Sequence, residues 1–207
     1  MLVLASGSPR RQDLLRSAGI SFVVQPADVD ETPLADESAR DCAERLAQEK
    51  ALTVWRKRPN DVVLGADTIV VVDGAILGKP VDPDDAARML RMLSGHVHEV
   101  ITGVCVVKAG ARPAPSQAPE LPRDPEVAAA SETTRVTVSL ISEDEIQEYV
   151  ATGEPMDKAG AYAIQGIASR WIPRIEGDYS NVVGLPVALV YRMWREVAGE
   201  GRQRSAT

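Results

Sequence analysis

Near-continuous apolar runs along the chain predict buried strands. Leu2 to Ala5 is a short run of this kind, and Val62 to Val72 is a longer one that is rich in valine. Asp73-Gly74 follows the longer run and is a strong signal for a two-residue hairpin, with Ala75 to Leu77 as the return strand. Further strands are predicted over Val97 to Val107, over Thr134 to Ile141 and in a hairpin around Glu176-Gly177-Asp178.

Helices are predicted where apolar residues recur at helical spacing behind a capping residue. Ser8 and Asp82 are each followed by proline, which favours the first position of a helix, and Ser142 to Glu145 form a capping box. The predicted helices are Pro9 to Ala18, Asp36 to Arg56, Pro83 to the residue before Gly95, Ser142 to Thr152, and Pro186 to Val197.

A proline-rich stretch interrupts this pattern. Ala109 to Pro125 carries five of the chain's fourteen prolines and has little apolar content. Because strand pattern resumes afterwards, we interpret the stretch as a flexible surface excursion inside one domain. We therefore expect a single domain over residues 1–199, with an insertion at 109–130 and a tail at 200–207.

Composition narrows the class of protein. The 207 residues are 44% hydrophobic and 26% charged, so the chain can bury one sizeable core or two small lobes that share a cleft. No apolar run approaches the ~20 residues that span a bilayer, and the start lacks the features of a signal peptide, so a cytoplasmic protein without a membrane partner is expected. Cys42 and Cys105 lie among apolar neighbours and are interpreted as reduced packing residues.

The formal net charge of −7 argues against a surface that binds duplex nucleic acid, because such affinity depends on cationic contacts to phosphate. Any anionic ligand must therefore be held by a local cluster of cations.

The turn from Ser6 to Arg11 is a candidate anion site. Its small residues bring backbone N–H groups and two hydroxyls to the positive end of a predicted helix. Arg10 and Arg11 lie in the first helical turn, where an exposed cation is unfavourable by about 0.3–1 kcal/mol, and a bound phosphate would reverse that sign. No Gly-Lys-Ser/Thr follows, so this is not a Walker loop, and a solvated capped turn is the alternative.

Asp67 is the second candidate, because aspartate is depleted from strands and costly to bury unpaired. Alternation places it on the strand face of Val63 and Ile69, with Thr68 on the opposite face, unless Gly65 marks a bulge. The residue needs a partner, a metal or a catalytic role, and a structural aspartate satisfied by a neighbouring turn is the alternative.

Two lysines and a glutamate complete the parts for polyphosphate cleavage. Lys50 falls on the apolar stripe of its helix, and Lys79 lies in Leu77-Gly78-Lys79-Pro80, although snorkelling and a solvated turn could explain them. Glu31 offers a second acidic ligand, and Mg²⁺ or Mn²⁺ would suit oxygen ligands of this kind. The cations and the metal would offset phosphate charge while the carboxylate positions a metal or a water.

Two other polar features are weaker. His96 and His98 could lie on one face of a strand, but two imidazoles without a third ligand make a poor zinc site. Gln165, in the stretch Asp157 to Gly166, can donate and accept at once, which suits reading the edge of a base.

Taken in order, these motifs resemble the Maf family of nucleotide pyrophosphatases, once linked to inhibition of septum formation. The family pattern spans about residues 1 to 195, and the matching segments are Ala5 to Arg11, Asp30-Glu31-Thr32, Leu46 to Ala51, Gly65 to Val70, Gly78-Lys79-Pro80, Leu93 to Gly103, Asp157 to Gly166 and Val183 to Pro186.

The resemblance implies a mixed α/β fold similar to the inosine-triphosphate pyrophosphatases, with a twisted sheet, flanking helices and a cleft between two lobes. It also implies release of pyrophosphate from nucleoside triphosphates with a divalent cation, in proteins that are often dimers. The residues of this chain that match the family's functional positions are Asp67 as general base; Ser6, Arg11, Lys50 and Lys79 as triphosphate ligands; and Glu31 beside the metal or water.

Substrate preference in the family follows the positions of Arg10, Thr68 and Gln165. Here these residues resemble the branch that hydrolyses dTTP and UTP, and other or modified nucleotides are further candidates. Two alternatives stand beside this reading. An aspartyl-phosphate phosphatase would use Asp67 as nucleophile but would want a second acid where Ile69 stands. A nucleotide-sensing regulator of cell division would need the phosphate cradle without Asp67.

Overall fold

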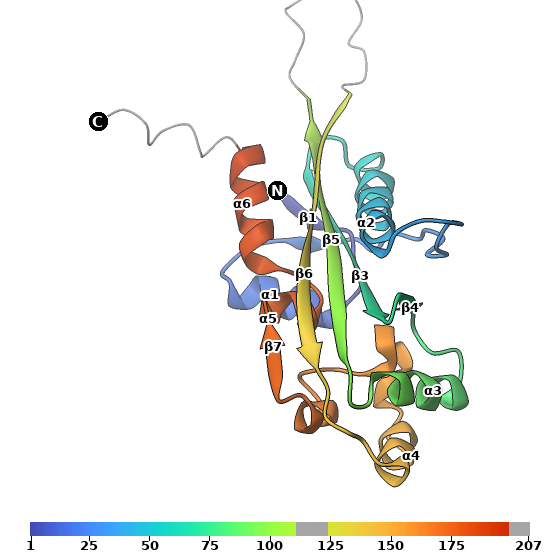
Figure 1. Cartoon of the computed structure of the whole chain (residues 1–207). Coiled ribbons are helices and arrows are strands. Elements are labelled where there is room, and N and C mark those ends of the chain that lie inside the picture. The colour runs from blue at the N-terminus through green and yellow to red at the C-terminus, as the bar shows by residue number, and fades with distance from the viewer. Residues whose placement is uncertain (111–123, 199–207) are drawn as a thin grey trace, which may run out of the picture.

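A mixed sheet of seven strands forms the centre of the computed structural model, which describes residues 1–110 and 124–198 (Figure 1). The strand order is β2-β1-β3-β5-β6-β7, and β4 pairs with β3 beside this path. β1 runs parallel to β2 and β3, whereas the other pairs are antiparallel. The strands are β1 (Leu2–Leu4), β2 (Val23–Val24), β3 (Val62–Val72), β4 (Ala75–Leu77), β5 (Val97–Ala109), β6 (Pro125–Thr137) and β7 (Arg174–Glu176).

Helices flank this sheet, so the expected mixed α/β class is confirmed. Ser8, Ser38, Asp82 and Ser142 cap their helices as side-chain acceptors, the last within a complete capping box. The helices are α1 (Pro9–Ser17), α2 (Ala39–Trp55), α3 (Pro83–Leu93), α4 (Glu143–Ala151), α5 (Tyr179–Val183) and α6 (Val187–Ala198), with short 3-10 turns η1 (Glu154–Asp157), η2 (Ala159–Ala161) and η3 (Ile167–Trp171).

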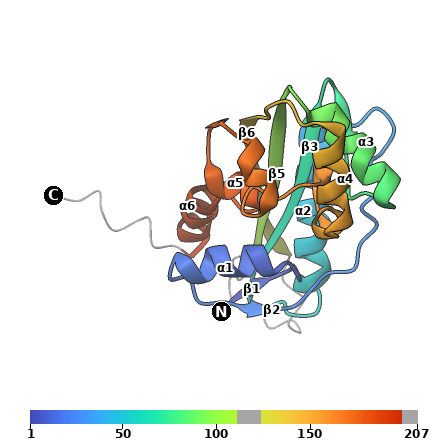
Figure 2. The ribbon, with the colours of Figure 1, turned by 90° about the horizontal axis from the view of Figure 1, so that it is seen from below.

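α2 and α6 lie on opposite sides of the long strands (Figure 1). α2 approaches so closely that a Cβ added at Gly65 or Gly103 would lie 2.1 Å from the carbonyl oxygens of Ala47 and Ala43, respectively. α6 packs its apolar stripe on the other face, where it shares a buried cluster with Leu64 of β3. α3 and α4 pack together around a separate cluster, at the end of the sheet where β4 lies (Figure 1 and Figure 2).

β3 has one edge that is only partly paired. β5 pairs with β3 from Val63 to Val71, but on the other edge β1 pairs with residues 62–64 and β4 with residues 70–72. Residues 65–69 therefore face a gap between β1 and β4. Because the gap interrupts the sheet edge, side chains from both faces of β3 can reach the same space there.

Two predicted strands differ from the structure. β6 begins at Pro125 rather than Thr134, because its backbone pairs with β5 along its whole length although its first half is rich in alanine and polar residues. The hairpin expected around Glu176-Gly177-Asp178 is wrong: β7 pairs with β6, and Asp178 instead caps α5.

Residues 111–123 and 199–207 lie outside the described residues. They include most of the insertion expected at 109–130 and all of the tail expected at 200–207. Within the described part of the chain, no helix is both long and apolar enough to cross a bilayer.

Candidate active site

The gap in the edge of β3 opens into a cleft of about 680 Å³. Its walls come from the turn between β1 and α1, from α2, from the middle of β3, from the β4 end and from the segment that contains η1 and η2. Every residue predicted from the sequence to form the site lines this cleft, namely Ser6, Arg10, Arg11, Glu31, Lys50, Asp67, Thr68, Lys79 and Gln165.

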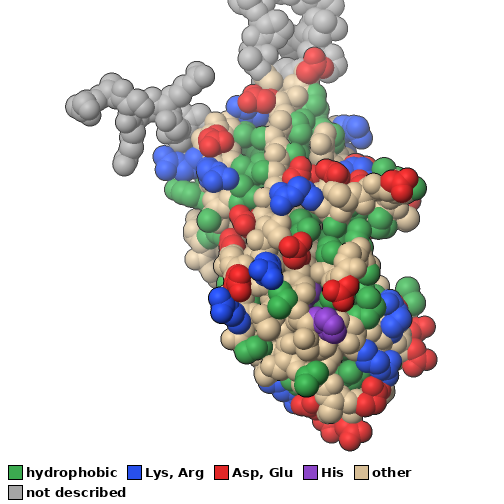
Figure 3. All heavy atoms as spheres, in the orientation of Figure 1, with side chains coloured by type: hydrophobic (Ala, Val, Ile, Leu, Met, Phe, Trp, Pro, Cys, Tyr) green, Lys and Arg blue, Asp and Glu red, His purple; other side chains and the backbone are tan. Residues whose placement is uncertain are grey.

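The cleft is cationic within an acidic protein. Five side chains in its lining are basic, Arg10, Arg11, Lys50, Lys79 and Lys158, and three are acidic, Glu31, Asp67 and Asp157. The chain as a whole carries a formal charge of −7. On the face drawn in Figure 3, by contrast, charges of both signs are interspersed. A local excess of cations in a concave site favours an anionic ligand.

An ammonium group joins the two central carboxylates. Lys50 Nζ donates to Asp67 Oδ1 at 2.6 Å and to Glu31 Oε1 at 2.5 Å. The side chains of Lys50 and Asp67 are only 8% and 12% exposed, so this pair is buried. Lys79, on the exposed side of the cleft, reaches Glu31 Oε2 at 3.2 Å.

These contacts distinguish between the alternative interpretations of Lys50 and Asp67 given by the sequence. The snorkelling interpretation of Lys50 is wrong, because its charged end is buried and paired rather than in water. Asp67 lies on the α2 face of β3, as alternation predicts, and its carboxylate is paired with a lysine rather than with a neighbouring turn.

The lysines also set the ionisation of Glu31. Partial burial opposes the charged form of this carboxyl, but hydrogen bonds and charge from Lys50 and Lys79 outweigh burial, so the pKa of Glu31 lies below its ordinary value. Glu31 is therefore an anion at neutral pH, available to the lysines or to another cation.

Arg11 organises the opposite wall. Its guanidinium donates to Ser6 Oγ at 3.1 Å, to Thr68 Oγ1 at 3.0 Å and to the Gly184 carbonyl at 2.8 Å. Burial lowers the pKa of Arg11, while the charges of Asp67 and Glu31 raise it; a guanidinium nevertheless stays protonated in proteins. Thr68, on the other face of β3 from Asp67, is thus held against Arg11.

Two of the three nucleotide-choice candidates, Arg10 and Gln165, lie at the outer part of the cleft. Arg10 makes an ion pair with Asp157 at 3.4 Å, and its side chain is 32% exposed. Gln165 is exposed on the segment between η2 and η3. Thr68 lies deeper and is bonded to Arg11, so these three candidates do not contact one another through any hydrogen bond of the described residues.

Asp67 and Glu31 also fit a divalent cation. Their oxygens converge on one cationic nitrogen, and carboxylate oxygens are the donors that Mg²⁺ and Mn²⁺ prefer. Across residues 1–110 and 124–198, no three His, Cys, Asp or Glu side chains gather as a metal site. The protein thus offers a two-carboxylate half-site, which is how Mg²⁺ is commonly bound when phosphates supply further ligands.

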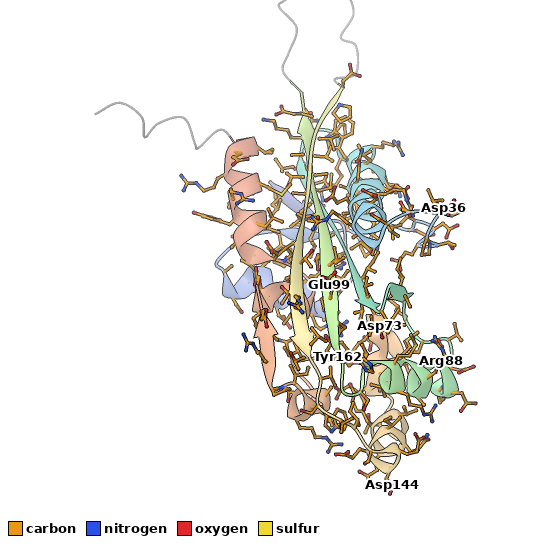
Figure 4. All side chains as sticks on the ribbon, viewed as in Figure 1. Asp36, Asp73, Arg88, Glu99, Asp144 and Tyr162 are labelled. Carbon is orange, nitrogen blue, oxygen red and sulfur yellow. The ribbon has the colours of Figure 1, made fainter. Side chains whose placement is uncertain are left out.

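The two histidines do not form a metal site in the described structure. His98 is buried and its Nε2 lies 2.8 Å from the Tyr162 hydroxyl, whereas His96 is exposed and its Nδ1 lies 2.8 Å from the Ser94 carbonyl. Tyr162, labelled in Figure 4, lies beside the sheet in the same half of the molecule as β4. Burial lowers the pKa of His98 to about 4.

Sequence reasoning missed the residues that hold the back of the site. Asn181 is completely buried and donates to the Val100 carbonyl at 2.9 Å and to Thr134 Oγ1 at 3.0 Å. These bonds fix α5, and the residue that follows this helix, Gly184, has the carbonyl that accepts from Arg11. An asparagine three residues after a helix-capping aspartate, Asp178, was the available signal, but it reveals no partner.

Comparisons with known proteins place this chain in a family. The family model described as Maf-like protein matches residues 1–197. The dTTP/UTP pyrophosphatase of Koribacter versatilis (strain Ellin345) is 56% identical over 194 residues, covering 94% of this chain and 93% of that protein. The dTTP/UTP pyrophosphatase of Symbiobacterium thermophilum is 50% identical over 192 residues, covering 93% and 91%.

A solved structure is also similar over most of both chains. It is a nucleoside-triphosphatase, or dITP/XTP pyrophosphatase, from Mycobacterium abscessus. The match covers 98% of this chain and 99% of that protein. The two chains are 14% identical, with a TM-score of 0.40.

Proposed function

The chain belongs to the Maf-like protein family, and on this premise we propose that it hydrolyses dTTP and UTP to the nucleoside monophosphate and pyrophosphate. The observation that carries the proposal is the cationic cleft around one buried carboxylate, Asp67, in an otherwise acidic chain. Relatives that are 50–56% identical over nearly their whole length and are named dTTP/UTP pyrophosphatase support this choice of substrate. Other or modified nucleotides are secondary candidates.

The cationic side chains bind the phosphate end of the substrate. Arg11 and Ser6, at the amino end of α1, together with Lys50 and Lys79 across the cleft, surround a space that suits a triphosphate. Charge-assisted hydrogen bonds of this kind bind phosphate oxygens strongly and stabilise charge that develops during cleavage.

Asp67 is assigned the role of general base. Its carboxylate accepts a proton from a water molecule as the water oxygen bonds to phosphorus, and the bond between the α- and β-phosphates breaks to release pyrophosphate. Asp67 and Glu31 would hold Mg²⁺ or Mn²⁺, which when bound neutralises phosphate charge. Lys50 bonds both carboxylates and orients them toward the cleft.

Product analysis tests the reaction. Incubating the protein with dTTP or UTP and Mg²⁺ should yield the monophosphate and pyrophosphate in equal amounts, measured by chromatography. Nucleoside diphosphate and free phosphate would contradict this assignment.

A nucleotide-sensing regulator remains the second candidate, because the same cleft could bind a triphosphate without cleaving it. The two functions differ in their need for Asp67, which a protein that only binds the nucleotide would not use for chemistry.

A homodimer and a cytoplasmic location are also proposed, the homodimer from the family resemblance. Sedimentation would test the oligomeric state, and cell fractionation would test the location.

A further inference from the structure

The short turn η1 contacts the Arg10 side chain and the backbone next to Gln165, two of the candidates for nucleotide choice. It begins at Glu154 and ends at Asp157, and Asp157 makes the ion pair with Arg10. Glu154 instead contacts the backbone beside Gln165. Neither acidic residue belongs to the phosphate end of the cleft described above.

The Glu154 carboxylate is bonded to two separate elements. Its Oε1 accepts from the Tyr149 hydroxyl of α4 at 2.9 Å and from the Ile167 backbone N–H at 3.1 Å. Burial, and then the hydrogen bond to Glu154, raise the pKa of Tyr149, so the hydroxyl stays protonated and donates a hydrogen bond to the carboxylate. Tyr149 is itself buried, so the carboxylate is tied to a fixed point of the α3–α4 core.

The carboxylate also shapes the backbone that carries Gln165. The Gly166 N–H donates to the Ala163 carbonyl at 3.1 Å, which closes a turn around residues 164 and 165. A Cβ added at Gly166 would lie 2.0 Å from Glu154 Oε1, so the turn presses its backbone directly against the carboxylate. Ala163, Ile164 and Gln165 line the cleft, and Gln165 is exposed there.

We propose that Glu154 is a positioning residue for nucleotide selection, because its carboxylate fixes the turn that presents Gln165 to the base of a bound pyrimidine nucleotide. This inference rests on the proposed function and goes beyond it by assigning the selection of the base to a residue that does not itself face the ligand. Side chains that act on a ligand need their supporting contacts to hold them within a narrow geometry.

The test separates the base end from the phosphate end of the site. Equilibrium dissociation constants are measured by calorimetry for dTTP, dCTP and inorganic tripolyphosphate, with kcat and KM for the two nucleotides. Glu154→Ala should weaken dTTP binding by about tenfold, within the range of coupling between contacting residues, and reduce the preference for dTTP over dCTP. Its affinity for tripolyphosphate, which has no base, should stay within about twofold of the original, inside the error of such comparisons.

Three further variants make the result specific. Glu154→Gln keeps an oxygen for the Ile167 N–H and should restore the preference for dTTP. Glu143→Ala is the matched control, because Glu143 is an exposed acid of the same region that pairs with Arg91 and does not line the cleft. Gln165→Ala should lower the preference by itself, and adding Glu154→Ala to it should lower the preference no further.

Two results would overturn the proposal. One is an equal loss of dTTP and tripolyphosphate affinity in Glu154→Ala, which would show a general structural defect. The other is a full additional loss of preference in the double variant. If the original protein binds dTTP but releases no pyrophosphate, the proposed function fails while these binding measurements still test the positioning role. Wild-type protein that binds no nucleoside triphosphate would refute both.

Discussion

Lys50→Met removes the ammonium that Asp67 and Glu31 share while keeping an unbranched apolar stem on α2. In the original protein this ammonium occupies the position between the two carboxylates that suits a divalent cation. Lysine and metal ion therefore compete for the same oxygens when no nucleotide is bound. The variant should lose stability and at the same time gain affinity for a metal.

The geometry sets the size of the stability loss. Asp67 is 12% exposed and lies 2.6 Å from Lys50 Nζ, so the substitution leaves a buried carboxylate without its partner. Removing one partner of a buried pair costs about 3–5 kcal/mol. Glu31 keeps Lys79 and is about half exposed, which favours the lower end, about 3 kcal/mol. For a chain of this length the melting temperature should fall by about 6–12 °C.

Thermal unfolding with and without Mn²⁺ measures both effects in the absence of nucleotide. At a free Mn²⁺ concentration about 100 times its dissociation constant, the variant should recover about 2.7 kcal/mol. The original protein should gain much less, because Lys50 already neutralises the carboxylates. Affinity for a triphosphate should fall in the variant, since a phosphate ligand is lost.

Lys79→Met is the matched control, because Lys79 is 59% exposed and, among the described residues, forms an ion pair with Glu31 alone. Its loss should cost at most about 1 kcal/mol, as for other exposed ion pairs. Equal stabilisation of Lys50→Met and the original protein by Mn²⁺ would refute competition between lysine and metal. Unaltered triphosphate affinity with reduced stability would show that Lys50 has only a structural role.

Three further predictions concern the frame of the site. The pKa of His98 is about 4 in the folded chain, below its ordinary value, so the unfolded chain binds more protons between these two pH values. The free energy of unfolding should therefore fall by about 3 kcal/mol as the pH drops from about 6.5 to 4. Denaturant unfolding at several pH values should show this slope, and the slope should be smaller in His98→Gln. Gly103→Ala places a methyl group 2.1 Å from the Ala43 carbonyl and should cost about 3 kcal/mol in chemical unfolding, whereas Gly78→Ala, which meets no atom within 4 Å, should cost little. Asn181→Ala removes the side-chain donor to the Val100 carbonyl, whereas Thr134 Oγ1 still accepts from the Asp178 N–H, so the free energy of unfolding should fall by about 1–3 kcal/mol.

Many helix starts and strand faces could be predicted from the sequence, because they depend on residues that are close together in the chain. Ser8 followed by Pro9, Asp82 followed by Pro83, and the capping box at Ser142 fixed the starts of three helices to within a residue or two. Alternation along β3 placed Asp67 and Thr68 on opposite faces, as observed. The first half of β6 gave no such signal, because pairing with β5 rather than its own residue pattern makes it a strand.

The candidate site was predictable in its members but not in its contacts. Lys50 was a candidate because its charge interrupts the apolar stripe of its helix. Its position between two carboxylates, however, depends on β3 and on the loop that carries Glu31. The support for Arg11 from Gly184 crosses 173 positions of the sequence, and no local pattern encodes such a separation. Glu154 was overlooked for the same reason, since its partners become apparent only once α4 and the turn beside Gln165 are in place.

The most direct test of the central claim is Asp67→Asn, which keeps the shape of the side chain and removes the base. Triphosphate affinity by calorimetry and pyrophosphate release by a coupled assay are measured on the same preparation. We predict near-normal binding of dTTP and turnover reduced by a factor of about 10² or more. Turnover equal to that of the original protein would remove Asp67 from the chemistry and contradict the account.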